Sequence, residues 1–150
     1  MICVEPGPSF GELVQHHDSG KKKLHLVNLF YLIKGEEHSK ISAYFNHDNN
    51  GHKIRGIFLQ GNPELRKIFE DYLSPFHGVG AKTVSVENAC CTDHVPFDAL
   101  NIPAFEWIQD PMHYFSHQIH TNLDVLDLVT ESSLNHNAAI IATFVYHTAM

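Results

Sequence analysis

The sequence predicts an α/β protein in which helices flank a mixed β-sheet. Short segments rich in aromatic and β-branched residues alternate with segments of helical period, an order that is typical of this class. Polar turns separate the segments from one another. The composition, 43% hydrophobic and 18% charged over 150 residues, is that of a globular chain long enough for one hydrophobic core.

Four strands are expected in the second part of the chain. Each is a run of apolar and β-forming residues that ends at a polar stretch or at one containing glycine or proline. The expected strands are residues 40–46, 54–60, 82–87 and 102–109. The segments around them are expected to be a polar turn at 47–53, a loop with one helical turn at 90–101 and a long loop at 110–124.

A helix is expected between the second and the third strand. Asn62 is a suitable N-cap, Pro63 suits the first helical position, and Glu64 suits the first turn. Four apolar or aromatic residues then fall on one face: Leu65, Phe69, Tyr72 and Leu73. Because proline cannot continue a helix, we expect this one to end before Pro75.

A second helix is expected to close the chain over residues 130–150. Thr130 or Ser132 provides its N-terminal cap. Its expected buried face steps by three and four residues: Leu134, Ala138, Ile141, Val145 and Thr148.

Residues 1–40 give weaker signals. They contain one strand-like run, residues 24–33, and we therefore place a domain boundary near residue 40. The longest apolar run is too short to span a membrane. The sequence starts without a basic segment followed by an apolar one, so no export signal is expected.

Charge and cysteine content limit the classes of function. A formal net charge of −7, with only 10 Lys and Arg residues, argues against a nucleic acid or an anionic membrane as partner. Two of the three cysteines, Cys90 and Cys91, are adjacent. Because sequence neighbours rarely bridge each other without strain, we expect free thiols, and the compartment is left open.

Three residues follow the expected strand ends: Asp48, Asp93 and His120. In α/β sheets, ligands bind at loops beyond the carboxyl ends of the strands, so these residues are candidates for a site. Each also has a simple structural interpretation. Asp48 suits a polar turn, Asp93 or the preceding Thr92 suits a helix N-cap, and His120 suits an exposed loop.

Four stretches between Ile41 and Met150 carry a resemblance to a known family: ISAYFNHDNNGHKIRGIFLQGN, CCTDHVPFDALNIPAFEWIQDP, IHTNLDVLD and NHNAAIIATFVYHTAM. In this order they resemble the C-terminal half of the di-zinc aminopeptidase and glutamate carboxypeptidase family, and most closely its bacterial members and plasma glutamate carboxypeptidase. The resemblance implies a partial three-layer sandwich of the zinc-exopeptidase type, with residues 41–150 as the C-terminal half of the catalytic domain. Members of this family are often secreted or periplasmic.

The resemblance also implies a role for each candidate residue. Asp48 corresponds to a carboxylate ligand of one zinc ion, and His120 corresponds to an imidazole ligand of the other. Asp93 and His94 correspond to groups that stand behind the ligands and orient them, and Asp124 corresponds to a residue that orders the loop. In this family two zinc ions activate a shared water and polarise the scissile carbonyl, while a glutamate accepts the proton.

The other groups of the family site would come from the N-terminal segment. The stretch HHDSG offers His16 as a zinc ligand, and KGEEHS offers Glu36 as the base and Glu37 as a ligand. However, no Asp lies between Asp18 and Asp48 to bridge two ions. Only ten residues separate Glu37 from Asp48, where the family has a helix and a strand. The alternative interpretation is therefore that His16, Glu36 and Glu37 match the family motifs by chance.

We expect the C-terminal half of a zinc-dependent exopeptidase, which hydrolyses a peptide substrate once an N-terminal half completes it. The incomplete ligand set predicts an inactive lone chain, and a non-catalytic pseudo-peptidase or a fragment is the alternative. A glutaminyl-cyclase-like acyltransferase is a further alternative, which Thr92 before Asp93 and Ile119 before His120 disfavour. Half of a doubly covered sheet would expose an apolar sheet face, so self-association is also expected.

Overall fold

The computed structural model describes residues 41–48, 51–111 and 113–150. The chain forms two compact units, each made of two stretches of sequence. Among the described residues, the first unit contains 41–46 together with Ala89–Phe105, and the second contains His47–Asn88 together with Glu106–Met150.

Four strands form one sheet in the order β1-β4-β2-β3. Their bounds are Tyr44–Asn46 for β1, Ile54–Phe58 for β2, Thr83–Ser85 for β3 and Ala104–Gln109 for β4. Strand β2 is parallel to β3 and antiparallel to β4, so the sheet is mixed, as the sequence predicts. Strands β2 and β3 approach so closely that a Cβ atom on Gly56 would overlap the carbonyl of Thr83, which explains the glycine at that position.

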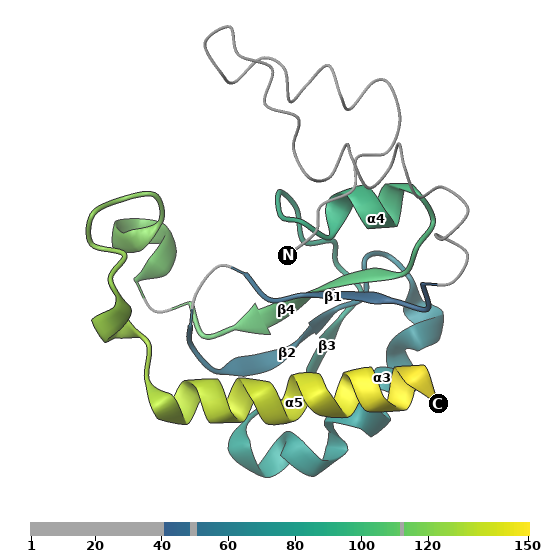
Figure 1. The fold of residues 1–150 in the computed structure, drawn as a ribbon. Coiled ribbons are helices and arrows are strands. Elements are labelled where there is room, and N and C mark those ends of the chain that lie inside the picture. Colours follow the sequence, from purple (N-terminus) through teal and green to yellow (C-terminus); the bar gives the residue numbers. More distant parts are fainter. Residues whose placement is uncertain (1–40, 49–50, 112) are drawn as a thin grey trace, which may run out of the picture. The chain divides into compact units, whose positions relative to one another are not determined.

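In the second unit, two helices pack together beside the strands. Helix α5 (Glu131–Ala149) runs along β2, and helix α3 (Arg66–Leu73) contacts both α5 and β3 (Figure 1). The core between them is aromatic. The ring of Phe144 lies 4.9 Å from Trp107, 5.2 Å from Phe69 and 5.2 Å from Tyr72, measured between centroids. No helix among the described residues is long and apolar enough to cross a membrane.

The start and end of α3 confirm the sequence signals. The side chain of Asn62 accepts a hydrogen bond from the backbone N–H of Glu64, which caps a short 3-10 turn, Pro63–Leu65, that leads into α3. The α-helix ends at Leu73, before Pro75, and the chain continues as a 3-10 helix over Ser74–Val79. Phe69 and Leu73 are the buried residues of α3.

Helix α5 starts as predicted but buries a different face. The Thr130 hydroxyl accepts a hydrogen bond from the N–H of Ser133 and caps the helix. The buried residues are Ser133, Asn137, Ile140 and Phe144, each one position before a residue of the expected face. The expected face was wrong: Leu134 and Val145 are both 51% exposed. A shift of one residue turns a helix by about 100°.

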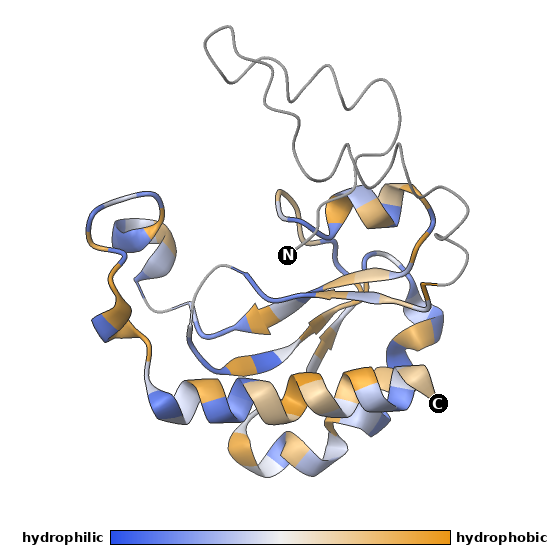
Figure 2. Ribbon diagram, in the orientation of Figure 1, coloured by the Kyte–Doolittle hydropathy of each residue, from blue (hydrophilic) through white to orange (hydrophobic). Residues whose placement is uncertain are grey.

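The reason for the shift is a polar residue, Asn137, that was not part of the expected face. Asn137 is buried, and its side chain accepts from the N–H of Ile54 and donates to the carbonyl of His52, at 2.8 Å in both cases. These two bonds satisfy the amide inside the protein. The displaced apolar residues stay at the surface, and Figure 2 shows that α5 is hydrophobic along much of its length.

The first unit has a smaller core around helix α4 (Val95–Ala99). The ring of Phe97 on this helix stacks on Tyr44 of β1, with 4.1 Å between centroids and an interplanar angle of 7°. Ile102 and Ala104 complete the buried cluster. Helix α4 is the helical turn expected within residues 90–101.

Candidate active site

Asp48 follows the end of strand β1, as predicted, and is half-buried. The residue before it, His47, is held by two side-chain amides. The Nε2 atom of His47 lies 3.1 Å from Nδ2 of Asn137 and 3.4 Å from Nε2 of Gln109. Because amide nitrogens only donate, Nε2 accepts both hydrogen bonds and the ring is neutral with its proton on Nδ1. Burial lowers the pKa of His47, which favours the same neutral form.

His120 lies in the segment expected to be a long loop, which contains one helical element. Residues Tyr114–Gln118 form a π-helical turn, and two turns follow. The Thr121 hydroxyl donates to the carbonyls of His117 and Gln118, at 2.8 and 2.9 Å, and accepts from the N–H of Leu123. The Thr121 side chain therefore forms hydrogen bonds with residues before and after His120 and stabilises this part of the loop.

The backbone of His120 has a φ of 57°, which places it in the left-handed region. Few residues other than glycine adopt this conformation, although histidine, asparagine and aspartate do so more often than the rest. Its imidazole is exposed. Strained backbone of this kind gathers at ligand sites, so the geometry singles out His120 among the exposed histidines of this loop.

Tyr114 lies in the loop that carries His120, and two carboxylates act electrostatically on its hydroxyl group. Burial raises the pKa of the Tyr114 phenol, and the charges of Asp48 and Asp124 raise it further. Both carboxylates therefore lie within electrostatic reach of one hydroxyl group. Asp124 was predicted to order the loop, and its backbone N–H donates to the carbonyl of Thr121.

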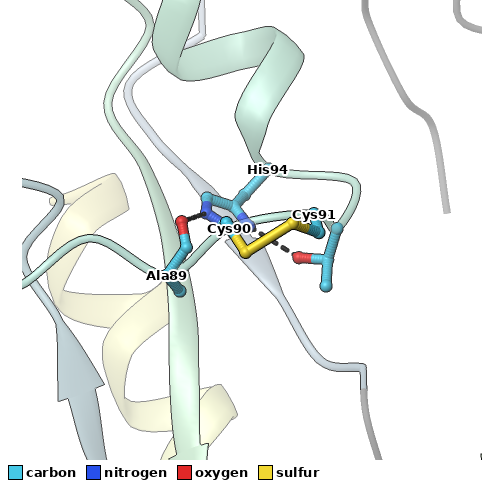
Figure 3. Close-up of a disulfide and its surroundings, with 5 residues drawn as sticks. Ala89, Cys90, Cys91 and His94 are labelled. Carbon is cyan, nitrogen blue, oxygen red and sulfur yellow. Dashed lines mark hydrogen bonds between the residues drawn. A yellow bond between two sulfur atoms is a disulfide. The ribbon is translucent and has the colours of Figure 1, made fainter.

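Asp93 and His94 belong to the first unit. His94 is fully buried and is the N-cap of α4, without a side-chain capping bond, so neither Thr92 nor Asp93 acts as the cap considered for this helix. The ring Nε2 donates to the carbonyl of Ala89 at 3.2 Å, and Nδ1 accepts from the hydroxyl of Thr92 at 2.7 Å (Figure 3). Burial lowers the pKa of His94, which is consistent with a neutral ring.

The same chain of hydrogen bonds reaches strand β1. The Thr92 hydroxyl accepts from the side-chain amide of Asn46 at 3.0 Å, and the oxygen of that amide accepts from the hydroxyl of Tyr44. His94 is thus a structural residue of this network. Asp93 stands between Thr92 and His94 and is half-buried.

The cysteines next to this network differ from the expectation. Cys90 and Cys91 form a disulfide, with their Cα atoms 3.7 Å apart, so the prediction of free thiols was wrong for this pair. Cys91 has a φ of 72°, a left-handed backbone that lets two adjacent side chains turn toward each other.

The described residues do not by themselves make a zinc site. Asp48 and His120 offer donors of the right chemical types, a carboxylate and an imidazole. Within residues 41–48, 51–111 and 113–150, however, no group of three or more His, Cys, Asp or Glu side chains could hold a metal ion. Zinc in proteins takes three or four protein ligands. His16, Glu36 and Glu37 lie outside the described residues.

Two further residues matter here that sequence reasoning missed. Asn137 positions the histidine next to Asp48, and Tyr114 lies near Asp48 and Asp124. An asparagine within the apolar stretch of α5 was a usable signal, because a polar residue there needs a partner. Tyr114 gave no signal of this kind.

The model of peptidase family M28 matches residues 26–145 of the chain. The chain belongs to peptidase family M28. Peptidases of this family are generally zinc-dependent. The resemblance seen in the sequence is therefore confirmed, and so is the α/β class with a mixed sheet.

One solved M28 structure is similar to the chain in fold. It is the crystal structure of a peptidase M28 precursor from Shewanella amazonensis SB2B, with 21% sequence identity and a TM-score of 0.64. The similarity covers 83% of this chain and 28% of that chain, so the present chain spans less than a third of the length of that M28 protein. No curated protein matches the chain.

The range of the M28 match bears on the N-terminal candidates. It begins at residue 26 and therefore contains Glu36 and Glu37, whereas His16 lies before it. The boundary predicted near residue 40 stays a prediction.

Proposed function

We propose that residues 41–150 form the C-terminal part of an M28 metallopeptidase domain and supply Asp48 and His120 to its zinc site. Peptide-bond hydrolysis near a chain end is the activity of the completed domain, and its substrate is a peptide. The observation that carries this proposal is the M28 match over residues 26–145, which includes both residues. The left-handed backbone of His120 and the charge of Asp48 at Tyr114 support it.

Glu36 and Glu37 are the N-terminal residues that this proposal favours. Both lie within the M28 match, and a carboxylate is the group that accepts a proton in general base catalysis. In the proposal Glu36 is the base and Glu37 is a metal ligand. His16 is a weaker candidate because it precedes the match.

The proposal predicts a weak metal site in the chain alone. The described residues contribute two donors, whereas a stable zinc site needs three or four. Hydrolysis by the lone chain should therefore be slow or absent. A non-catalytic role of the same scaffold is the second candidate, and it is favoured by the lack of any three-donor group within the described residues.

A zinc titration of the full chain tests the assignment of ligands. His120→Asn and Asp48→Asn remove one donor each, and asparagine also tolerates the left-handed backbone at position 120. His77→Asn is the matched control, because His77 is exposed and lies far along the chain from both candidates. Micromolar or tighter binding that is lost in the first two variants but kept in the control supports the proposal.

Equal binding by all four proteins would overturn the metal role of Asp48 and His120, and no binding at all would exclude a catalytic metal site in the lone chain. A separate assay addresses the activity. Zinc-loaded chain is incubated with an aminoacyl amide and with a peptide that ends in glutamate, and release of the terminal residue is measured. Release of a terminal residue would favour the metallopeptidase role over the non-catalytic one, whereas zinc binding without release is expected of the lone chain in either role.

A further inference from the structure

The disulfide between Cys90 and Cys91 lies in the segment before helix α4 of the first unit (Figure 3). Both cysteines are exposed, so dissolved thiols can reach either sulfur. Exposed disulfides are the ones that thiols reduce most readily. We propose that Cys90–Cys91 is a site of reversible reduction by small or protein thiols, and that its redox state sets the backbone conformation of the loop that carries Asp93.

A disulfide between neighbours contributes little to global stability. In the chain-entropy account, a disulfide stabilises a protein by restricting the unfolded chain, and the effect grows with the length of the loop that it closes. Cys90 and Cys91 close the shortest loop possible, since no residue lies between them. The effect of this disulfide on the folded protein is therefore confined to the residues next to Cys90 and Cys91.

The local effect is visible in the backbone of Cys91. Its φ of 72° lies in the left-handed region, which residues with a Cβ atom rarely adopt. The ring formed by the disulfide holds Cys91 in this conformation. When the sulfur–sulfur bond is broken, Cys91 is free to return to negative φ, and the peptide groups on either side rotate with it.

The residues on either side of the disulfide hold the buried imidazole of His94. The ring accepts from the Thr92 hydroxyl, directly after the disulfide, and donates to the Ala89 carbonyl, directly before it. A rotation at Cys91 changes the distance between these two partners, so both bonds cannot persist unchanged. Asp93 lies between Thr92 and His94 and moves with them.

The exchange reaction is balanced by two equivalents of thiol. A thiolate attacks one sulfur of the pair, the Cys90–Cys91 bond breaks, and the released cysteine thiolate takes up a proton. A second thiolate then attacks the mixed disulfide, which releases the other cysteine and the oxidised form of the reductant. Two electrons and two protons enter the protein, and the reductant becomes a disulfide.

The test begins with the wild-type full chain. It is equilibrated in mixtures of reduced and oxidised dithiothreitol, alkylated, and analysed by peptide mass. We expect alkylation of Cys90 and Cys91 to rise together with the fraction of reductant and to reverse on reoxidation, without a change in far-UV circular dichroism. The probe phenylarsine oxide, which binds paired thiolates, should bind the reduced form alone.

Hydrogen exchange then measures the effect on the loop. The N–H of Val95 donates to the carbonyl of Thr92 at 3.2 Å, so its exchange rate reports on the loop. Reduction should speed this exchange by about tenfold, the order expected when one left-handed residue is released. The N–H of Lys82, which donates to Arg55 in the other unit, should not change.

Two double variants separate the effect of the sulfur–sulfur bond from the effect of the backbone conformation at position 91. Cys90→Ser with Cys91→Ala removes the bond and disfavours positive φ, so it should behave like the reduced protein. Cys90→Ser with Cys91→Gly removes the bond but permits positive φ, so it should exchange like the oxidised protein and ignore reductant. The proposal is overturned if Cys90 and Cys91 react with the alkylating agent before any reduction. It is equally overturned if Val95 exchanges at one rate in both redox states, or if the glycine and alanine variants do not differ.

Discussion

Replacement of Asn137 by alanine should destabilise the second unit through hydrogen bonds that are left unmade. In the wild type the Asn137 side chain pairs with the N–H of Ile54, the carbonyl of His52 and Nε2 of His47. The Ile54 N–H would be orphaned in the core, because Ile54 is fully buried. The other two groups would each keep a second partner, Gln109.

The magnitude follows from these partners. An orphaned buried donor costs about 1–3 kcal/mol, and each of the two weakened acceptors adds about 0.5 kcal/mol, which gives about 2–4 kcal/mol in all. Alanine is the better helix former by about 0.5 kcal/mol, which offsets part of this loss. The control Asn135→Ala changes the same residue type in the same helix at an exposed position, so it carries the propensity gain alone. The free energies of unfolding of the two variants should thus differ by about 2–4 kcal/mol.

The assay is urea unfolding followed by tryptophan fluorescence. The chain has one tryptophan, Trp107, which is 2% exposed and packs edge-on against Phe144 of α5. Its emission therefore reports on the unit that contains Asn137. A difference between Asn137→Ala and Asn135→Ala below about 0.5 kcal/mol would refute the idea that Asn137 sets the buried face of α5.

Three further predictions concern the core, pH and association. Phe144→Ala should cost about 3–5 kcal/mol in urea unfolding, whereas Val145→Ala should cost less than about 1 kcal/mol; similar losses would mean that the other face is buried. Because burial holds the pKa of His94 below its ordinary value of 6.5, the unfolded chain binds the proton first, and stability should fall as the pH drops below about 6.5. Calorimetry of His94→Gln should show a flatter pH dependence, and an unchanged slope would contradict this assignment. Self-association, measured by sedimentation, should weaken in Leu134→Lys, since this residue is 51% exposed on an apolar face of α5; equal sedimentation would exclude that face.

The sequence could predict elements whose signals are local. The caps at Asn62 and Thr130 depend on residues within one turn, and both are present as predicted. The buried face of α5 could not be predicted in this way. Two apolar stripes lie side by side on that helix, and the choice between them depends on Ile54 and Trp107, which are distant in sequence.

The candidate site also combines features that local sequence predicts with features that depend on the folded structure. Asp48 and His120 could be named from short motifs, because each motif lies within a few residues. The left-handed backbone of His120, the proximity of Asp48 to Tyr114 and the bridge between Cys90 and Cys91 depend on how the loops fold, and no residue pattern encodes them directly. The expectation of free thiols fails at Cys90 and Cys91, where Cys91 has a φ of 72°.

The outward apolar stripe of α5, which includes Leu134 and Val145, is a reason to measure stability at more than one protein concentration. If two copies cover each other's stripe, folded dimers are favoured by mass action, and the melting temperature rises as the sample becomes more concentrated. In that case a dilute sample would report on the monomer and a concentrated one on the dimer. Stability values for this protein are comparable when they refer to one stated dilution.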